Sequence, residues 1–125
     1  MNKKHEEYLY KKYPKLYRQH VLDMSETALC WGLQCGSGWF KILDKLSAQI
    51  TKVCPTAEAT TVKEKLGSLR VYLTKEPKAV HELIQKAADE SYRTCEECGK
   101  PGVAKADSFG WISVLCKKCR KKEGK

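Results

Sequence analysis

Two Cys-x-x-Cys pairs near the C-terminal end constrain the fold of this 125-residue chain more than any other feature. The pairs are Cys95–Cys98 and Cys116–Cys119, and residues 99–115 separate them. Two intervening residues let a tight turn direct both thiolates at one ion, and two such turns supply a tetrahedron of sulfurs. The spacing predicts a zinc site, which is expected to be structural because four sulfur ligands leave no open position for water.

Two other chemistries also use paired cysteines. A thioredoxin-like redox motif needs only one pair, at the start of a helix in a parallel α/β fold, and the chain lacks that pattern. Four cysteines can hold an iron–sulfur cluster, but the regular two-pair spacing favours zinc. The segment Phe109–Leu115 resembles a strand leading into the second pair. Residues 94–125 are therefore predicted to form a zinc ribbon with a basic tail.

The remaining cysteines are Cys30, Cys35 and Cys54, which bring the total to seven. An odd number cannot pair completely, so a disulfide framework is disfavoured and buried thiols are expected. A second metal site made by Cys30, Cys35 and either His20 or Cys54 is the alternative. The apolar neighbours of Cys30 and Cys35 favour packing over metal binding.

The N-terminus has positive residues without an apolar run behind them, and no stretch approaches the roughly 20 apolar residues of a membrane-spanning helix. A cytoplasmic protein that does not contact a membrane is expected. Residues 1–27 are basic and rich in tyrosine. They predict either an arm that binds nucleic acid or a short helix, interrupted at Pro14, whose tyrosines pack on the rest of the protein. The packed helix is favoured because tyrosines commonly bury their rings.

Residues 28–93 are predicted to form the body of the protein, and its first element is a helix. Apolar residues at three- and four-residue spacing predict that this helix begins at Trp39, is capped by Ser37 and ends at Pro55. The buried stripe is predicted to comprise Trp39, Ile42, Leu43, Leu46, Ile50 and Val53.

A hairpin and a second helix complete the body. Alternation over residues 58–74, with a turn at Gly67-Ser68, predicts a β-hairpin. A further apolar stripe predicts a helix that starts near Pro77. The predicted fold class is α+β, with a helix–β-hairpin–helix body and a C-terminal zinc ribbon.

The charge and the motifs predict a binding protein. A formal charge of +9 and a pI near 9.2 favour a polyanionic partner and argue against an acidic mimic of DNA. The chain has no Gly-rich phosphate loop, nucleophile elbow or His-Glu-x-x-His helix, so it is not expected to be an enzyme. Candidate binding residues, each of which could equally be solvated surface or core, are Lys63, Lys65, Arg70, Tyr72, Trp111, Lys117, Lys118, Arg120, Lys121 and Lys122.

A family resemblance rests on six segments, which are residues 12–17, 24–27, 30–32, 35–40, 62–72 and 94–99. These segments resemble a family of small uncharacterised bacteriophage and prophage proteins that end in two Cys-x-x-Cys pairs. The resemblance covers nearly the whole chain and implies a phage origin and an intracellular setting in an infected bacterium. The family carries no established activity.

Two functions follow as hypotheses. The first is binding to a host protein or nucleoprotein complex, for example as an inhibitor of a defence system such as a CRISPR effector, which requires an exposed aromatic or apolar anchor. The second is a regulatory zinc ribbon that binds DNA or RNA through its basic residues.

Overall fold

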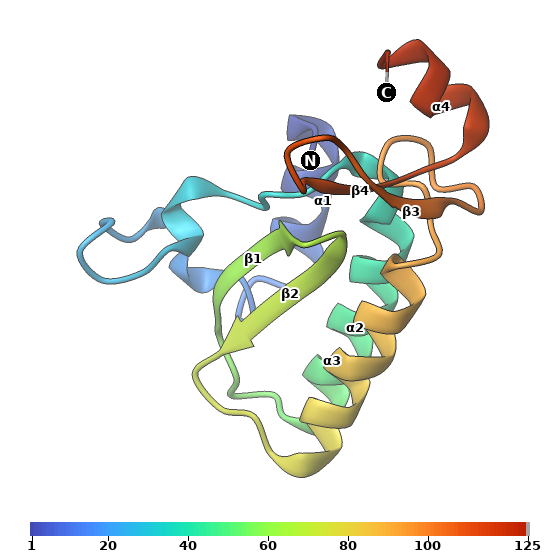
Figure 1. Ribbon diagram of the computed structural model, residues 1–125. Coiled ribbons are helices and arrows are strands. Elements are labelled where there is room, and N and C mark those ends of the chain that lie inside the picture. Colours follow the sequence, from blue (N-terminus) through green and yellow to red (C-terminus); the bar gives the residue numbers. More distant parts are fainter. Residues whose placement is uncertain (125) are drawn as a thin grey trace.

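The computed structural model describes residues 1–124, and Lys125 of the predicted basic tail lies outside them. The described residues form an α+β fold of helices and two small antiparallel hairpins, with a cysteine cluster near the C-terminus (Figure 1). The predicted α+β class, with a cysteine cluster near the C-terminus, is thereby confirmed. In chain order the elements are α1 (Lys3–Lys12), the 3₁₀ helices η1 (Arg18–Val21), η2 (Leu29–Trp31) and η3 (Ser37–Trp39), α2 (Phe40–Val53), β1 (Ala59–Lys65), β2 (Ser68–Leu73), α3 (Lys78–Ser91), β3 (Val103–Ala106), β4 (Ile112–Leu115) and α4 (Lys117–Lys122).

The N-terminal segment packs as a helix. The side chain of Asn2 caps α1 by accepting a hydrogen bond from the N–H of His5, and the helix ends before Pro14, which cannot donate to it. Leu9 and Tyr17 lie in the core, where the Tyr17 hydroxyl is 2.6 Å from the hydroxyl oxygen of Ser47. Complete burial raises the pKa of Tyr17 well above its usual range.

Helix α2 begins later than the sequence predicts. Residues Ser37–Trp39 form the 3₁₀ turn η3, and the α-helix starts at Phe40. The predicted cap is wrong, because the Ser37 hydroxyl accepts a hydrogen bond from the N–H of Asn2 instead. Most of the predicted stripe is buried, but Val53 at the end of the helix is exposed.

The first hairpin turns one residue earlier than predicted. Lys65 pairs with Ser68, so the two loop residues are Leu66 and Gly67, with φ of 54° and 83°. Positive φ at both positions matches the right-handed twist of the strands, and Gly67 supplies it without strain. Leu66 is exposed as a result and does not continue the buried alternation.

Helix α3 runs alongside α2 and packs against it and against β2 of the first hairpin (Figure 1). Its last residue, Ser91, is fully buried, accepts a hydrogen bond from the N–H of Leu69 at 2.8 Å and donates one to the carbonyl of Ala88. The other edge of this small sheet is occupied by Gln34, which bonds to the backbone of Val62 and Glu64 in β1.

Candidate metal centre

The four predicted ligands converge. The thiol sulfurs of Cys95, Cys98, Cys116 and Cys119 all lie within 4.8 Å of one another and could hold one metal ion. The sulfurs of Cys98 and Cys116 are 3.7 Å apart. A tetrahedral site with metal–sulfur bonds of about 2.3 Å has edges of about 3.8 Å. The Cys98–Cys116 edge already matches such a site, and no edge of the cluster exceeds 4.8 Å.

The first pair sits on a turn closed by two backbone hydrogen bonds. The N–H of Gly99 donates to the carbonyl of Cys95 at 2.9 Å, and the N–H of Cys95 donates to the carbonyl of Lys100 at 2.7 Å. Gly99 has a φ of 82°, which favours glycine directly after the second ligand. Burial would raise the pKa of the Cys95 thiol, but hydrogen bonds from the backbone amides of Cys116, Cys98 and Glu97 lower it.

The second pair opens helix α4. Cys116 is the N-cap residue, and its sulfur accepts a hydrogen bond from the N–H of Cys119 at 3.4 Å. That amide lowers the pKa of Cys116 to about 7, so the thiolate, which is the form that binds metal, is favoured near neutral pH.

A glycine-rich loop of the body, residues 36–38, is hydrogen-bonded to the turn that carries Cys95 and Cys98. The N–H of Gly38 donates to the carbonyl of Glu96 at 2.7 Å, and the N–H of Gly36 donates to the Glu96 carboxylate at 2.9 Å. A methyl group at Gly38 would collide with the carbonyl oxygen of Cys95 and with the backbone of Glu96. The indole N–H of Trp39 adds a hydrogen bond of 2.9 Å to the carbonyl of Thr94.

The other three cysteines do not assemble a second site. Among residues 1–124, only the four C-terminal cysteines form a group of potential ligands. Cys35 is buried, which raises its pKa to about 12 and makes it a poor nucleophile and ligand. The sulfur of Cys30 lies 3.4 Å from the carbonyl oxygen of Thr27, and His20 stacks on the ring of Tyr10.

Lysines surround the exposed side of the cysteine cluster. They line a hollow of about 480 Å³ together with Cys98, Cys116, Cys119 and Pro101. Four thiolates around a divalent ion leave a net negative charge, which these cations would offset. The lysines are Lys100, Lys117, Lys118 and Lys122.

Arg120 differs from its basic neighbours because its guanidinium is bound within the ribbon. It donates to the carbonyl of Val103 at 2.6 Å, to the hydroxyl of Ser113 at 3.1 Å and to the carbonyl of Ser113 at 3.2 Å. The side chain therefore ties α4 to both strands of the second hairpin. Lys117, Lys118, Lys121 and Lys122 on the same helix have no ion pair with another residue of 1–124.

The tip of the second hairpin presents two aromatic rings to solvent. Phe109 is 86% exposed and Trp111 is 75% exposed. The carboxylate of Asp107 fixes their backbone, because it accepts hydrogen bonds from the N–H of Phe109 at 2.8 Å and of Trp111 at 3.0 Å. We call Phe109 and Trp111 the aromatic tip.

The predicted residues of the first hairpin lie together on its outer face. Lys63 is directly opposite Arg70, and Tyr72 is opposite Thr61 in the same register. Lys65 is one pair closer to the turn on that face. The turn itself contacts the second hairpin, since a methyl group at Gly67 would lie 2.7 Å from a methyl of Ile112.

The Cys-x-x-Cys spacing does not reveal two residues that support this part of the structure, Glu96 and Asp107. Glu96 stands between two ligands and bonds to a loop 60 positions earlier in the chain. Asp107 looks like an ordinary turn residue in the sequence. Its place before Ser-Phe-Gly is nevertheless typical of an aspartate whose carboxylate accepts hydrogen bonds from the N–H groups that follow it.

None of the helices within residues 1–124 is long and apolar enough to cross a membrane. No protein-family model matches the chain, and neither a curated protein nor a solved structure matches it.

Proposed function

We propose that the four-cysteine centre holds one structural zinc ion and that the protein acts by binding a partner, without catalysing a reaction. The helix–β-hairpin–helix body serves as the platform for the ribbon. The observation that supports this function most directly is the aromatic tip, two large rings exposed on a loop whose backbone is fixed by Asp107. Exposed, pre-organised aromatic side chains are characteristic anchors of protein interfaces.

The zinc assignment rests on the donor set. Four cysteine sulfurs within 4.8 Å of one another, held by hydrogen-bonded turns, are typical of structural zinc. The protein purified from medium that contains both zinc and iron should hold one zinc ion per chain by elemental analysis. An iron–sulfur chromophore in the visible spectrum would overturn the assignment.

A protein or nucleoprotein partner fits the tip better than free nucleic acid does. The lysines around the centre face the negative charge of a zinc–tetrathiolate site, which reduces the positive potential that they present to phosphates. The resemblance to phage and prophage proteins suggests a host protein or nucleoprotein complex in the cytoplasm of an infected bacterium, with inhibition of a defence complex such as a CRISPR effector as one form of this role.

Binding of DNA or RNA is the second candidate function. It is supported by four lysines of α4 that form no ion pair within residues 1–124, and by the exposed rings of the aromatic tip, on which bases could stack. The lysines are Lys117, Lys118, Lys121 and Lys122. This function predicts binding of a fluorescent single strand or duplex that weakens steeply as salt rises.

Affinity capture from bacterial lysate, with and without nuclease, separates these candidates. The wild-type chain is compared with the double variant Phe109→Ala, Trp111→Ala, whose changes lie at the exposed tip and should leave the fold intact. A protein that is captured after nuclease treatment by the wild type, and not by the variant, supports the proposed function. Capture that disappears with nuclease supports the second candidate, and equal capture by both chains contradicts the role of the tip.

A further inference from the structure

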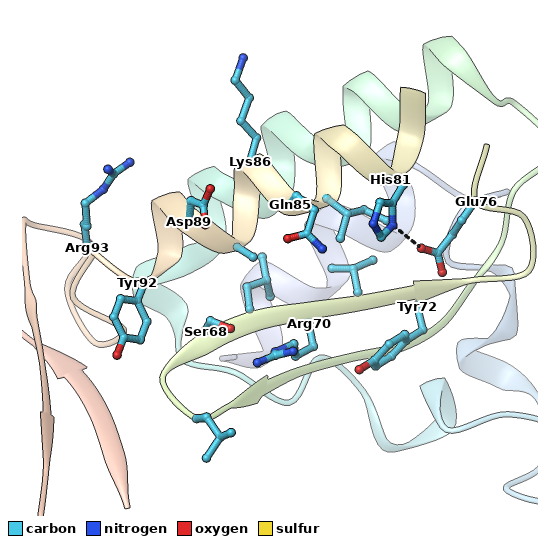
Figure 2. Close-up of a pocket in the computed structure, with 15 residues that line it drawn as sticks. Ser68, Arg70, Tyr72, Glu76, His81, Gln85, Lys86, Asp89, Tyr92 and Arg93 are labelled. Carbon is cyan, nitrogen blue, oxygen red and sulfur yellow. Dashed lines mark ion pairs between the residues drawn. The ribbon is translucent and has the colours of Figure 1, made fainter. Parts of the chain in front are cut away.

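A groove separates the outer edge of β2 from helix α3. It has a volume of about 650 Å³ and contains Arg70 and Tyr72 on the strand side and Gln85 and Asp89 on the helix side (Figure 2). Val71 and Ile84 contribute the apolar lining between them. Its lining contains none of the four cysteines and neither residue of the aromatic tip, although Arg93 at one end precedes Cys95 by two positions.

The backbone of β2 offers hydrogen bonds along this groove. In β1, Val62 and Glu64 bond outward to Gln34, so their partners Val71 and Leu69 direct their N–H and C=O groups to the opposite edge. The N–H of Leu69 already donates a hydrogen bond to the hydroxyl of Ser91. No residue of 1–124 outside the hairpin bonds to the N–H or the C=O of Val71.

The side chains beside this edge carry an excess of positive charge on the outer face. Arg70 stands directly opposite Lys63, and neither forms an ion pair within residues 1–124. Like charges directly opposite each other destabilise a strand pair. The Nε atom of Arg70 is also buried without a hydrogen-bond partner. An unpaired buried donor of this kind is unfavourable until an acceptor reaches it.

The acidic groups of the groove do not satisfy Arg70. Glu76 lies at the far end, where it is 3.6 Å from His81 and accepts from the N–H of Leu73. Asp89 lies on α3 without an ion pair among the described residues, and Arg93 follows one turn later (Figure 2). Arg70, partway along the groove, is therefore left without an acidic partner among the described residues and favours an anionic group.

We propose that the groove between β2 and α3 binds an extended acidic segment of a partner protein, which adds to the edge of β2 as a further strand. The N–H and C=O of Val71 bond to the backbone of the segment. Successive side chains of an added strand point to opposite faces. One set packs against Ile84 on α3, and the other places a carboxylate beside Arg70.

A second copy of this chain fits the edge less well. An edge-to-edge dimer would bring Arg70 and Lys63 of both copies toward one shared outer face, where their charges repel. The proposal rests on the binding function proposed above, but it uses residues distinct from the aromatic tip.

Selection from a random library of displayed peptides, a little longer than β2, tests the proposal. The bait is the full chain, and Arg70→Glu is the comparison, with Lys105→Glu as a control that makes the same charge change outside the groove. Enriched peptides should alternate apolar and acidic residues and lack proline in the middle. They should bind Arg70→Glu about 10- to 100-fold more weakly than wild type, as expected for loss of a charge-assisted hydrogen bond, and bind Lys105→Glu normally.

The amide of Val71 should become protected from hydrogen exchange in the complex. If Arg70→Glu does not fold, Arg70→Gln replaces it and should weaken binding by a smaller factor. Peptides that bind wild type and Arg70→Glu equally, peptides that form helices, or a concentration-dependent dimer that protects Val71 without peptide would each overturn the proposal. A synthetic selected peptide should bind Trp111→Ala normally, so failure at the groove is distinguishable from failure at the aromatic tip.

Discussion

Replacing Gly38 by alanine should uncouple the metal centre from the body of the protein. The added methyl group would collide with the backbone of Cys95 and Glu96, which cannot move without shifting the first ligand. The loop would have to retreat and weaken the hydrogen bonds of Gly38 and Gly36 to Glu96. A buried methyl forced into a filled space destabilises by about 1–3 kcal/mol, and each lost hydrogen bond adds about 0.5–1.5 kcal/mol.

The expected loss in the free energy of unfolding is therefore about 2–6 kcal/mol. Urea unfolding of the metal-loaded protein measures it, and the rate of metal transfer to a colorimetric chelator should rise in parallel. Gly110→Ala is the matched control, because a methyl there meets no atom within 4 Å. An alanine at this position must adopt a φ of 83°, which should lower the free energy of unfolding by about 1–2 kcal/mol. The rate of metal release should not rise. A Gly38→Ala protein as stable and as retentive of metal as wild type would refute the argument.

Three other perturbations have defined outcomes. The double change Cys116→Ser, Cys119→Ser should abolish metal binding and increase amide hydrogen exchange throughout β3, β4 and α4, whereas unchanged exchange would show that the ribbon folds without metal. Ser91→Ala leaves the N–H of Leu69 without its acceptor and should lower the free energy of unfolding by about 1–3 kcal/mol in urea titrations. The Arg18 guanidinium, which donates to both carboxylate oxygens of Glu58 at 3.0 and 2.9 Å, lowers the pKa of that carboxyl. The small stabilisation from this pair is present above the ordinary glutamate pKa and is lost as pH falls through the lowered value, so Arg18→Gln should flatten the acid limb of a stability–pH curve. An acid limb identical to that of wild type would contradict this role.

The features that followed from sequence are those set by local spacing. In each Cys-x-x-Cys pair a tight turn can direct both sulfurs to the same side, and the structure brings all four sulfurs together. The stripe on α2 is buried because three- and four-residue spacing places Ile42, Leu46 and Ile50 on one face. The fold class follows from the order of these patterns.

The features that sequence could not supply depend on contacts between distant segments. Gly36 and Gly38 look like loop residues until Glu96 is seen to bond to them from another part of the chain. The start of α2 moves to Phe40 because this docking holds residues 37–39 in a 3₁₀ turn. The turn of the first hairpin is misplaced because Ser68 also has turn chemistry, and only the register shows that it pairs with Lys65.

The burial of Trp39 should make its fluorescence sensitive to the state of the cysteine cluster. Trp39 is fully buried, whereas Trp31 and Trp111 are largely exposed and are expected to emit at longer wavelength. The indole N–H of Trp39 bonds to the residue that directly precedes Cys95. A loosening of the Cys95 turn should therefore reach the one shielded indole among the three, and loss of the proposed metal ion is expected to shift the emission of Trp39 to longer wavelength, without a label.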